Sequence, residues 1–393
     1  MELLKHELYK IFSKKTLYIT MLFFLLVTIF LHPSANYFTK EYGSVRDFYK
    51  EYYQQYEGPV TPEKVMLAED GNRQIAEYKE EYTEQHNGSP VDFGPKTAIH
   101  RKNVVFSEIL EADQKAKAHN ALINTLEQRL KTMENKGQHD FEYKKTKLHY
   151  SMVKKIKAPG IYFNWGWRET SDFINKLGTL IMGAMILLGV STVFSNEYTT
   201  NMDALILSSK NGKSRVITAK LLASGIFIVI VALFFTLLNL LIQFKTMGFV
   251  GGNGTLQGLF RYENSPYGWT LVQYIPRQIA VHLFGSLAFG FIALLISSLC
   301  KSGLASFFIS GCIFGLPLFF NSILYIKSGW IAKINEFSYA VLMRGQPIFS
   351  QFKAFNVFGQ PVLYLNLMLV LFTLLSIVVI YLTYRSFRSH QVS

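Results

Sequence analysis

Long apolar runs alternate with short basic segments along most of this 393-residue chain. A helix that crosses a bilayer needs about 20 mainly apolar residues. Stretches that satisfy this requirement predict six transmembrane helices, at residues 16–32, 177–195, 216–244, 275–300, 303–326 and 361–384. No small-residue cleavage pattern of a signal peptide follows the first stretch, so we expect it to remain as an anchor. The pattern predicts an all-α polytopic membrane protein.

The first 15 residues predict an amphipathic helix that lies along the inner membrane surface. Its apolar residues share one face and its lysines occupy the other, where they can meet anionic headgroups. The apolar positions are Leu4, Leu8, Ile11 and Phe12.

Residues 33–170 read as an external, mainly helical domain between the first two spans. Residues 61–85 and 97–136 are rich in Glu, Lys, Gln and Ala, and their apolar positions suit a helical hairpin with a modest core. The dipeptides at 87–88 and 94–95 supply the break between the two helices.

Two aromatic clusters mark this domain. We interpret the first, which has helical spacing, as the packing face of a short helix; the alternative is a contact surface for a substrate. It comprises Phe48, Tyr49, Tyr52, Tyr53 and Tyr56. The second precedes the second span, where an interfacial aromatic belt is expected. It comprises Tyr162, Phe163, Trp165 and Trp167.

Charge is unevenly distributed along the chain. Only 17% of the residues are charged, against about 25% in soluble domains. Residues 33–170 hold 21 of the 40 Lys and Arg and 20 of the 27 Asp and Glu. This distribution excludes a single soluble enzyme domain, a disordered chain and a disulfide-rich secreted module. The two cysteines, Cys300 and Cys312, lie in apolar stretches and are expected to be buried hydrophobes.

The net charge of +13 comes from basic residues that flank the spans. It therefore indicates a positive-inside topology and no nucleic-acid partner. An even number of spans places both termini in the cytoplasm of a multi-pass protein of the cell membrane. The basic connection between the fifth and sixth spans would then be external, and its mixed apolar character suggests helices that partly dip into the membrane.

Enzyme motifs are missing from the sequence. His6-Glu7 begins like a zinc-protease motif, but Lys10 replaces the second ligand. Gly212-Lys213-Ser214 ends like a phosphate-binding loop, but Leu207 stands in place of its leading glycine. We therefore expect no catalytic residue, no metal site and no cofactor in this chain.

Polar residues inside the spans are few, and such residues are costly in lipid. We take His282, Arg277 and Asn239 as candidates for a substrate path. For Arg277 the alternative is a side chain that reaches the nearby membrane boundary, and for His282 it is a purely structural role. No span carries a central Asp or Glu, so transport energy is expected to come from a partner.

The second cytoplasmic loop, within residues 195–220, has the pattern of a lever. Asn196 can cap a short helix and Glu197 would lie in its first turn, where the helix dipole favours an anion. Four apolar positions predict a helix parallel to the membrane, and a basic run that includes Ser214 and Arg215 returns the chain to the third span. The four positions are Tyr198, Met202, Leu205 and Ile206. The alternative is a positive-inside loop without further function.

This loop resembles that of ABC-2-type permeases, the membrane subunits of type V ABC exporters. The matching residues are Phe194, Ser195, Glu197, Leu205, Leu207, Ser214, Arg215 and Lys220. Asn201 and Met202 stand where the family usually has a Gly-Thr pair, and the proline before Ser214 is missing. The six-span order and the large insert after the first span resemble a subgroup common in Gram-positive bacteria.

The resemblance implies a permease that pairs with a second permease, identical or different, above two separate ABC ATPase subunits. ATP and magnesium would be bound by those partners, and the loop around Glu197 would receive their motion. The rival interpretation is a polytopic anchor that displays residues 33–170 as a receptor or sensing domain without transport. A passive anchor needs no lever helix in the second cytoplasmic loop, and this feature separates the two.

Overall fold

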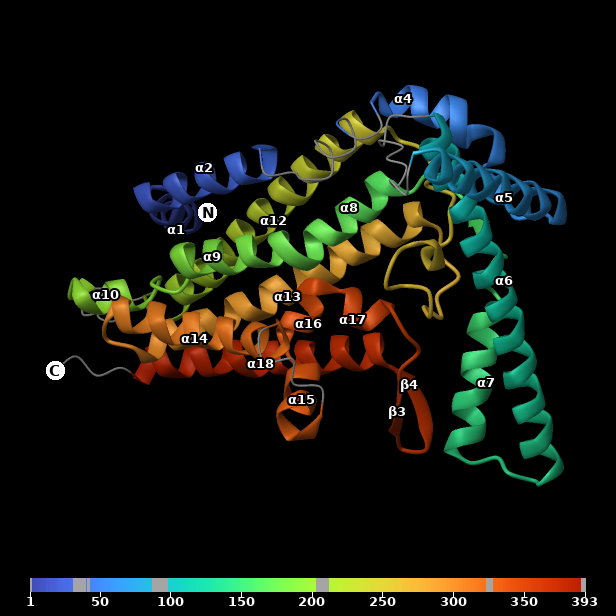
Figure 1. Ribbon diagram of the computed structural model, residues 1–393. Helices are drawn as coiled ribbons and strands as arrows, with labels where there is room; N and C mark the ends of the chain where they lie inside the picture. Colours follow the sequence, from blue (N-terminus) through green and yellow to red (C-terminus); the bar gives the residue numbers. More distant parts are fainter. Residues whose placement is uncertain are drawn as a thin grey trace.

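The computed structural model describes residues 2–30, 40, 43–86, 98–202, 212–322 and 328–389. Its main body is a bundle of long helices, with a smaller helical domain at one end (Figure 1). In the described residues, five helical segments are long and apolar enough to cross a membrane, and α1 and α2, which meet at 62°, would make a sixth. The all-α polytopic fold is confirmed.

Within the described part of the chain, the membrane bundle is built from ten helical elements. They are α1 (Glu2–Phe12), α2 (Lys15–Phe30), α8 (Trp165–Phe173), η3 (Ile174–Gly178), α9 (Thr179–Gly189), η4 (Gly212–Val216), α12 (Ile217–Met247), α13 (Leu271–Leu299), α14 (Gly303–Ser322) and α18 (Tyr364–Ser389). The second span is one continuous segment formed by α8, η3 and α9. The helix α1 and the end of α18 lie at the same end of the bundle (Figure 1).

Several predicted span limits differ from the structure by a few residues or more, and two of these differences have a local cause. The second span begins at Trp165 rather than 177, because Asp172 and Lys176 form an i,i+4 ion pair of 2.7 Å within one helix instead of ending it. The last helix begins at Tyr364, since the residues just before it form a β-hairpin.

The domain between α2 and α8 is mainly helical. Its elements are α4 (Val45–Phe48), η1 (Tyr49–Tyr53), η2 (Gln54–Tyr56), β1 (Gly58–Pro59), α5 (Pro62–Gln85), α6 (Ala98–Asn135), α7 (Phe141–Val153) and β2 (Gly160–Ile161). Thr61 caps α5 by accepting the amide of Lys64, and Pro62 occupies the first helical position. The helices α5 and α6 match the two predicted stretches and pack together, while α7, which packs along α6, was not predicted. The predicted breaks at 87–88 and 94–95 lie outside the described residues.

Aromatic side chains form the core of this domain. Phe48 and Tyr53 are buried, and both rings contact the ring of Phe163. The first aromatic cluster is therefore a packing face, as predicted. The belt interpretation is wrong for Phe163 and Trp167, because both are buried and Trp167 Nε1 donates a 2.7 Å hydrogen bond to the Val250 carbonyl.

The connections carry the remaining elements, among them three short helices and a β-hairpin between α14 and α18. They are α10 (Ser195–Thr199), η5 (Leu256–Gly258), α15 (Gly329–Glu336), α16 (Tyr339–Arg344), α17 (Gln346–Phe349), β3 (Ala354–Val357) and β4 (Gln360–Leu363). The helix α16 packs closely on α13, where a Cβ on Gly285 would come within 2.6 Å of the Met343 nitrogen. These helices agree with the predicted mixed connection, and their membrane depth remains a prediction.

Candidate coupling site

The short helix α10 carries Glu197 and lies at the end of the bundle that also holds α1 (Figure 1). Glu197 is in its first turn, as predicted. The amides of Phe194 and Ser195 donate to Ser297 Oγ at 3.0 and 3.1 Å. The prediction that Asn196 caps this helix is therefore wrong. The helix α10 already begins at Ser195, and a serine of α13 accepts the hydrogen bonds of the two amides at its start.

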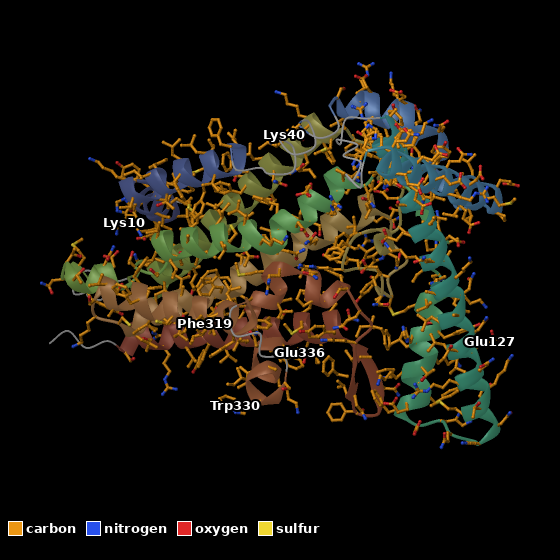
Figure 2. All side chains as sticks on the ribbon, viewed as in Figure 1. Lys10, Lys40, Glu127, Phe319, Trp330 and Glu336 are labelled. Carbon is orange, nitrogen blue, oxygen red and sulfur yellow. The ribbon has the colours of Figure 1, made fainter. Side chains whose placement is uncertain are left out.

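Glu197 belongs to a cluster of four charged side chains that joins α1, α10 and α12. Lys220 Nζ lies 2.7 Å from Glu197 Oε1 and 2.8 Å from Glu7 Oε2. Lys10 Nζ lies 2.9 Å from Glu197 Oε1 and 3.6 Å from Glu7 Oε1. The lysine of α12 is 1% exposed, while Lys10 reaches solvent at the edge of the cluster (Figure 2).

The cluster is electrically balanced, with two carboxylates and two ammonium groups. Burial by itself would raise the pKa of Glu197, but the attraction and hydrogen bonds of Lys220 and Lys10 outweigh it and hold the pKa below the usual range. The Phe194 ring centroid lies 5.8 Å from Lys220 Nζ and adds a cation–π contact. Because removal of one partner would leave a buried charge, this arrangement fixes the three helices to one another.

Tyr198 fixes α10 to the opposite side of the bundle. Its hydroxyl donates a 3.0 Å hydrogen bond to the Ser298 carbonyl at the end of α13. Its ring stacks on Phe387 of α18, with centroids 5.9 Å apart. A displacement of α10 would therefore pull on α12 through Lys220 and on α13 and α18 through Tyr198.

The predicted lever helix is interrupted. Asn201 has a φ of 54° after α10 ends, so Tyr198 and Met202 do not share one helical face. Tyr198 is buried and Met202 is 43% exposed. Leu205 and Ile206 lie outside the described residues. At the start of the third span, Ser214 and Arg215 are exposed.

A cleft of about 390 Å³ opens beside the charged cluster. Its walls come from α1, α10, the preceding turn and α12, and they include Glu7, Lys10, Lys14, Asn196, Glu197, Thr200 and Met202. At the far side of the cleft, Lys14 Nζ donates to the carbonyls of Leu188 and Gly189 at 3.1 and 3.0 Å, at the end of α9.

Glu7, Lys10 and Lys14 belong to this site and were not predicted from the sequence. One signal was available: Glu7 lies three residues after Leu4 and four before Ile11, so it stands on the apolar face of α1. A carboxylate at such a position requires a buried partner. The identity of that partner, 213 residues away, could not be read from the chain.

The candidate substrate-path residues do not share one environment. His282 is fully buried, and its Nδ1 lies 2.5 Å from the Met343 carbonyl of α16. Arg277, on the same helix, is exposed and stacks over Trp269 at 4.8 Å. Asn239 is buried within α12. These contacts are structural, and a transport role for the three residues stays a prediction.

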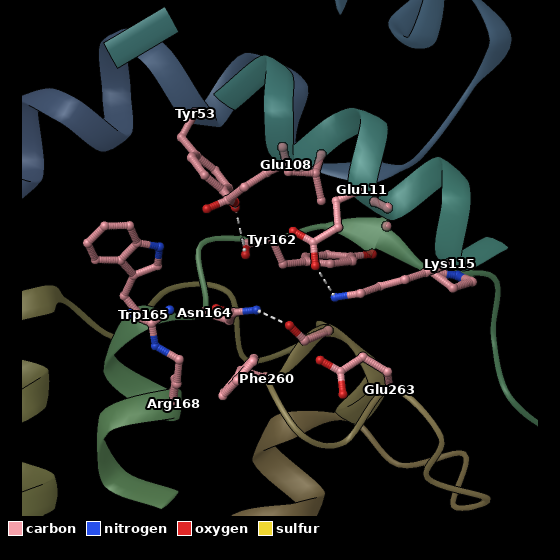
Figure 3. Close-up of a pocket in the computed structure, with 15 residues that line it drawn as sticks. Tyr53, Glu108, Glu111, Lys115, Tyr162, Asn164, Trp165, Arg168, Phe260 and Glu263 are labelled. Carbon is pink, nitrogen blue, oxygen red and sulfur yellow. Dashed lines mark hydrogen bonds and ion pairs between the residues drawn. The ribbon is translucent and has the colours of Figure 1, made fainter. Parts of the chain in front are cut away.

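A second cavity, of about 220 Å³, lies where the smaller domain meets the bundle (Figure 3). Tyr53 donates from its hydroxyl to Glu108 and to the Tyr162 carbonyl. Burial raises the pKa of Glu108, although hydrogen bonds from Tyr53 and Trp165 act in the opposite direction. The cavity also contains the Lys115–Glu111 ion pair of 2.8 Å, so its charges are largely paired within the protein. Over the described ranges, no group of three His, Cys, Asp or Glu side chains is arranged to hold a metal ion.

Comparison with curated proteins and with solved structures found no match. A family model described as ABC-2 family transporter protein matches residues 1–390, including the smaller domain as well as the spans. Members of this family are permease-type membrane components of ABC transporters and are not themselves the ATPases. From its first helix to the end of α18, this multi-pass membrane protein therefore belongs to the ABC-2 transporter family.

Proposed function

We propose that the chain is the permease subunit of an ATP-driven exporter and that the cleft beside Glu197 receives a separate ABC ATPase subunit. The observation that best supports this proposal is the Lys220 cluster, which joins the exposed edge of the site to a membrane-spanning helix through ion pairs of 2.7 and 2.8 Å. ATP and magnesium bind to the partner. The end of the bundle with α1 and α10 faces the cytoplasm, and the smaller domain faces outward.

Export also requires a closed path, and we propose that two permeases pair to form it. They are two copies of this chain or this chain and a related one. The helices α14 and α18 carry rows of exposed apolar side chains, which suit lipid or a second permease. The protein is placed in the cell membrane with both termini inside.

Cysteine cross-linking tests the ATPase contact directly. The variant Met202→Cys puts a thiol at the exposed edge of the cleft, and Met66→Cys puts one at a still more exposed methionine of the smaller domain. Both are made with the native thiols Cys300 and Cys312 replaced by serine. The prediction that these two cysteines are buried is wrong, because Cys300 is half-buried and Cys312 is exposed. In native membranes, a short bifunctional thiol- and amine-reactive reagent should join only the Met202→Cys protein to an ATP-hydrolysing partner.

Either of two results would overturn this assignment. One is a Met202→Cys protein that purifies with an ATPase but never cross-links to it. The other is an ATPase cross-linked through Met66→Cys. If no ATPase is recovered with any form of the protein, the receptor or anchor interpretation would be favoured. The family match over residues 1–390 argues against that interpretation.

A further inference from the structure

An apolar groove of about 680 Å³ runs between the η3–α9 segment and α14. This volume lies within the range of small-molecule sites in proteins. Leu180 forms one wall and Phe319, labelled in Figure 2, forms part of the other. Both are partly exposed, and the groove opens to the side of the bundle.

The groove is open at its middle because of a glycine. A Cβ on Gly315 would meet no atom within 4 Å, so the space beside α14 is free at this position. From Cys312 to Phe319 the helix rises by about 10 Å. That length is about two thirds of one bilayer leaflet, whose hydrocarbon layer is about 15 Å thick.

One end of the groove is basic, and it lies toward the smaller domain. Lys176 and Arg344 line this end, but the ammonium of Lys176 is neutralised by Asp172 at 2.7 Å. Arg344 is half-buried, and no described carboxylate oxygen lies within 4 Å of its guanidinium. Its Nε donates only a long, 3.4 Å hydrogen bond to the Asn175 carbonyl.

The surroundings of Arg344 increase its need for an anion. Burial lowers its pKa, and the positive charge of Arg261 lowers it further. A half-buried guanidinium without a described carboxylate partner and next to an apolar wall gains most from a phosphate, which it can bind through two parallel N–H donors. A small soluble anion would leave the apolar walls uncovered.

We propose that this groove binds a phospholipid with an anionic headgroup, whose phosphate meets Arg344 and whose acyl chain lies along the α9 and α14 walls past Gly315. The inference needs only that the protein is embedded in a bilayer, which the family match establishes. It does not depend on the proposed exporter function, because the lipid would bind without ATP or a partner subunit.

Native mass spectrometry of the full, purified chain tests the proposal. Delipidated protein is titrated with phosphatidylglycerol and with diacylglycerol of the same acyl chains, which lacks the phosphate. Wild type should prefer phosphatidylglycerol by about tenfold, the size expected for one hydrogen-bonded charge pair. Arg344→Gln should lose this preference and Arg344→Lys should keep part of it. Arg385→Gln, which removes an exposed arginine at the other end of the bundle, should leave it unchanged.

A second variant tests the acyl-chain part of the site independently. Gly315→Trp places a large side chain in the groove, starting from a Cβ position that meets no described atom within 4 Å, and should weaken the binding of both lipids. Equal binding of the two lipids by wild type, or full preference in Arg344→Gln, would overturn the headgroup assignment. If glycerol phosphate, which has no acyl chain, displaces phosphatidylglycerol at equal concentration, the site binds a free anion and the lipid proposal is wrong.

Discussion

Lys220 and Glu7 lie 213 residues apart in the chain, and their side chains meet at 2.8 Å in a buried ion pair. The pair holds the N-terminal helix against the start of α12, although the two helices are far apart in the sequence. With Glu197 it makes α1 part of the coupling site. The N-terminal helix is therefore a component of the proposed lever.

The variant Lys220→Met tests how much this cluster stabilises the fold. Two buried carboxylates would be left without their shared cation, so we expect a loss of about 3–5 kcal/mol in the free energy of unfolding. Thermal unfolding of the purified protein measures it. Lys5→Met, which removes an exposed lysine from the same end of the molecule, should leave the melting temperature unchanged. Equal behaviour of the two variants would show that the buried cluster does not hold α1 in place.

Ser297 should be required for the position of α10. Replacing it with alanine removes the acceptor for the Phe194 and Ser195 amides, and the loss of such a cap costs about 1 kcal/mol. Hydrogen exchange at these two amides should become faster in Ser297→Ala. The neighbouring Ser298→Ala is the matched control, because within the described residues the hydroxyl of Ser298 donates to the Leu295 carbonyl of its own helix and does not contact α10. Unchanged exchange in Ser297→Ala would contradict the assigned cap.

Gly251→Ala should loosen the contact between the 248–270 loop and the smaller domain. Gly251 has a φ of 71°, and a Cβ there would overlap the Phe163 carbonyl group. The control is Gly137→Ala. Gly137 has a similar φ of 63°, but a Cβ there would meet no described atom within 4 Å, so this variant measures the backbone strain alone, about 1 kcal/mol. We expect Gly251→Ala to lower the melting temperature clearly more than Gly137→Ala. The same shift for both would mean that the loop does not pack against Phe163.

The contact between α7 and the β3–β4 region should weaken in acid. The His149 ring stacks on Phe352 with centroids 4.0 Å apart, and Lys144 Nζ donates to the Gly359 carbonyl at 3.3 Å. Burial, and then the charge of Lys145, lower the pKa of His149 below its usual 6.5. The folded state therefore favours the neutral His149 ring. The stabilisation that the neutral ring contributes is complete above pH 6.5 and is lost as the pH falls through the lowered pKa.

Hydrogen exchange of residues 354–363, corrected for the intrinsic effect of pH, measures this change. Protection should fall in wild type between about pH 7.5 and about pH 5. The variant His149→Phe keeps a ring for stacking and removes the titrating group, so its protection should not depend on pH over this interval. A pH-dependent loss of equal size in both proteins would assign the effect to another group.

The sequence determined the membrane class and most of the helices. Apolar runs of about 20 residues are specific to spans, and their positions agree with α2, α9, α12, α13, α14 and α18 within a few residues at most ends. The cap at Thr61 and the uninterrupted helical composition after residue 97 likewise defined α5 and α6. These features are local, since hydrophobic length, caps and propensity act over one helix at a time.

Tertiary structure decided which residues act together. Glu197 was found from its loop, but its partners come from α1 and α12, and the cap of α10 comes from α13. The predicted lever helix is interrupted at Asn201, which adopts a left-handed conformation that the apolar spacing could not reveal. That Arg344 lacks a carboxylate partner among the described residues, and that no described atom fills the space beside Gly315, depends on helices from distant parts of the chain. Charge pairing and empty space are properties of neighbours in three dimensions, and the order of residues in one chain does not specify them.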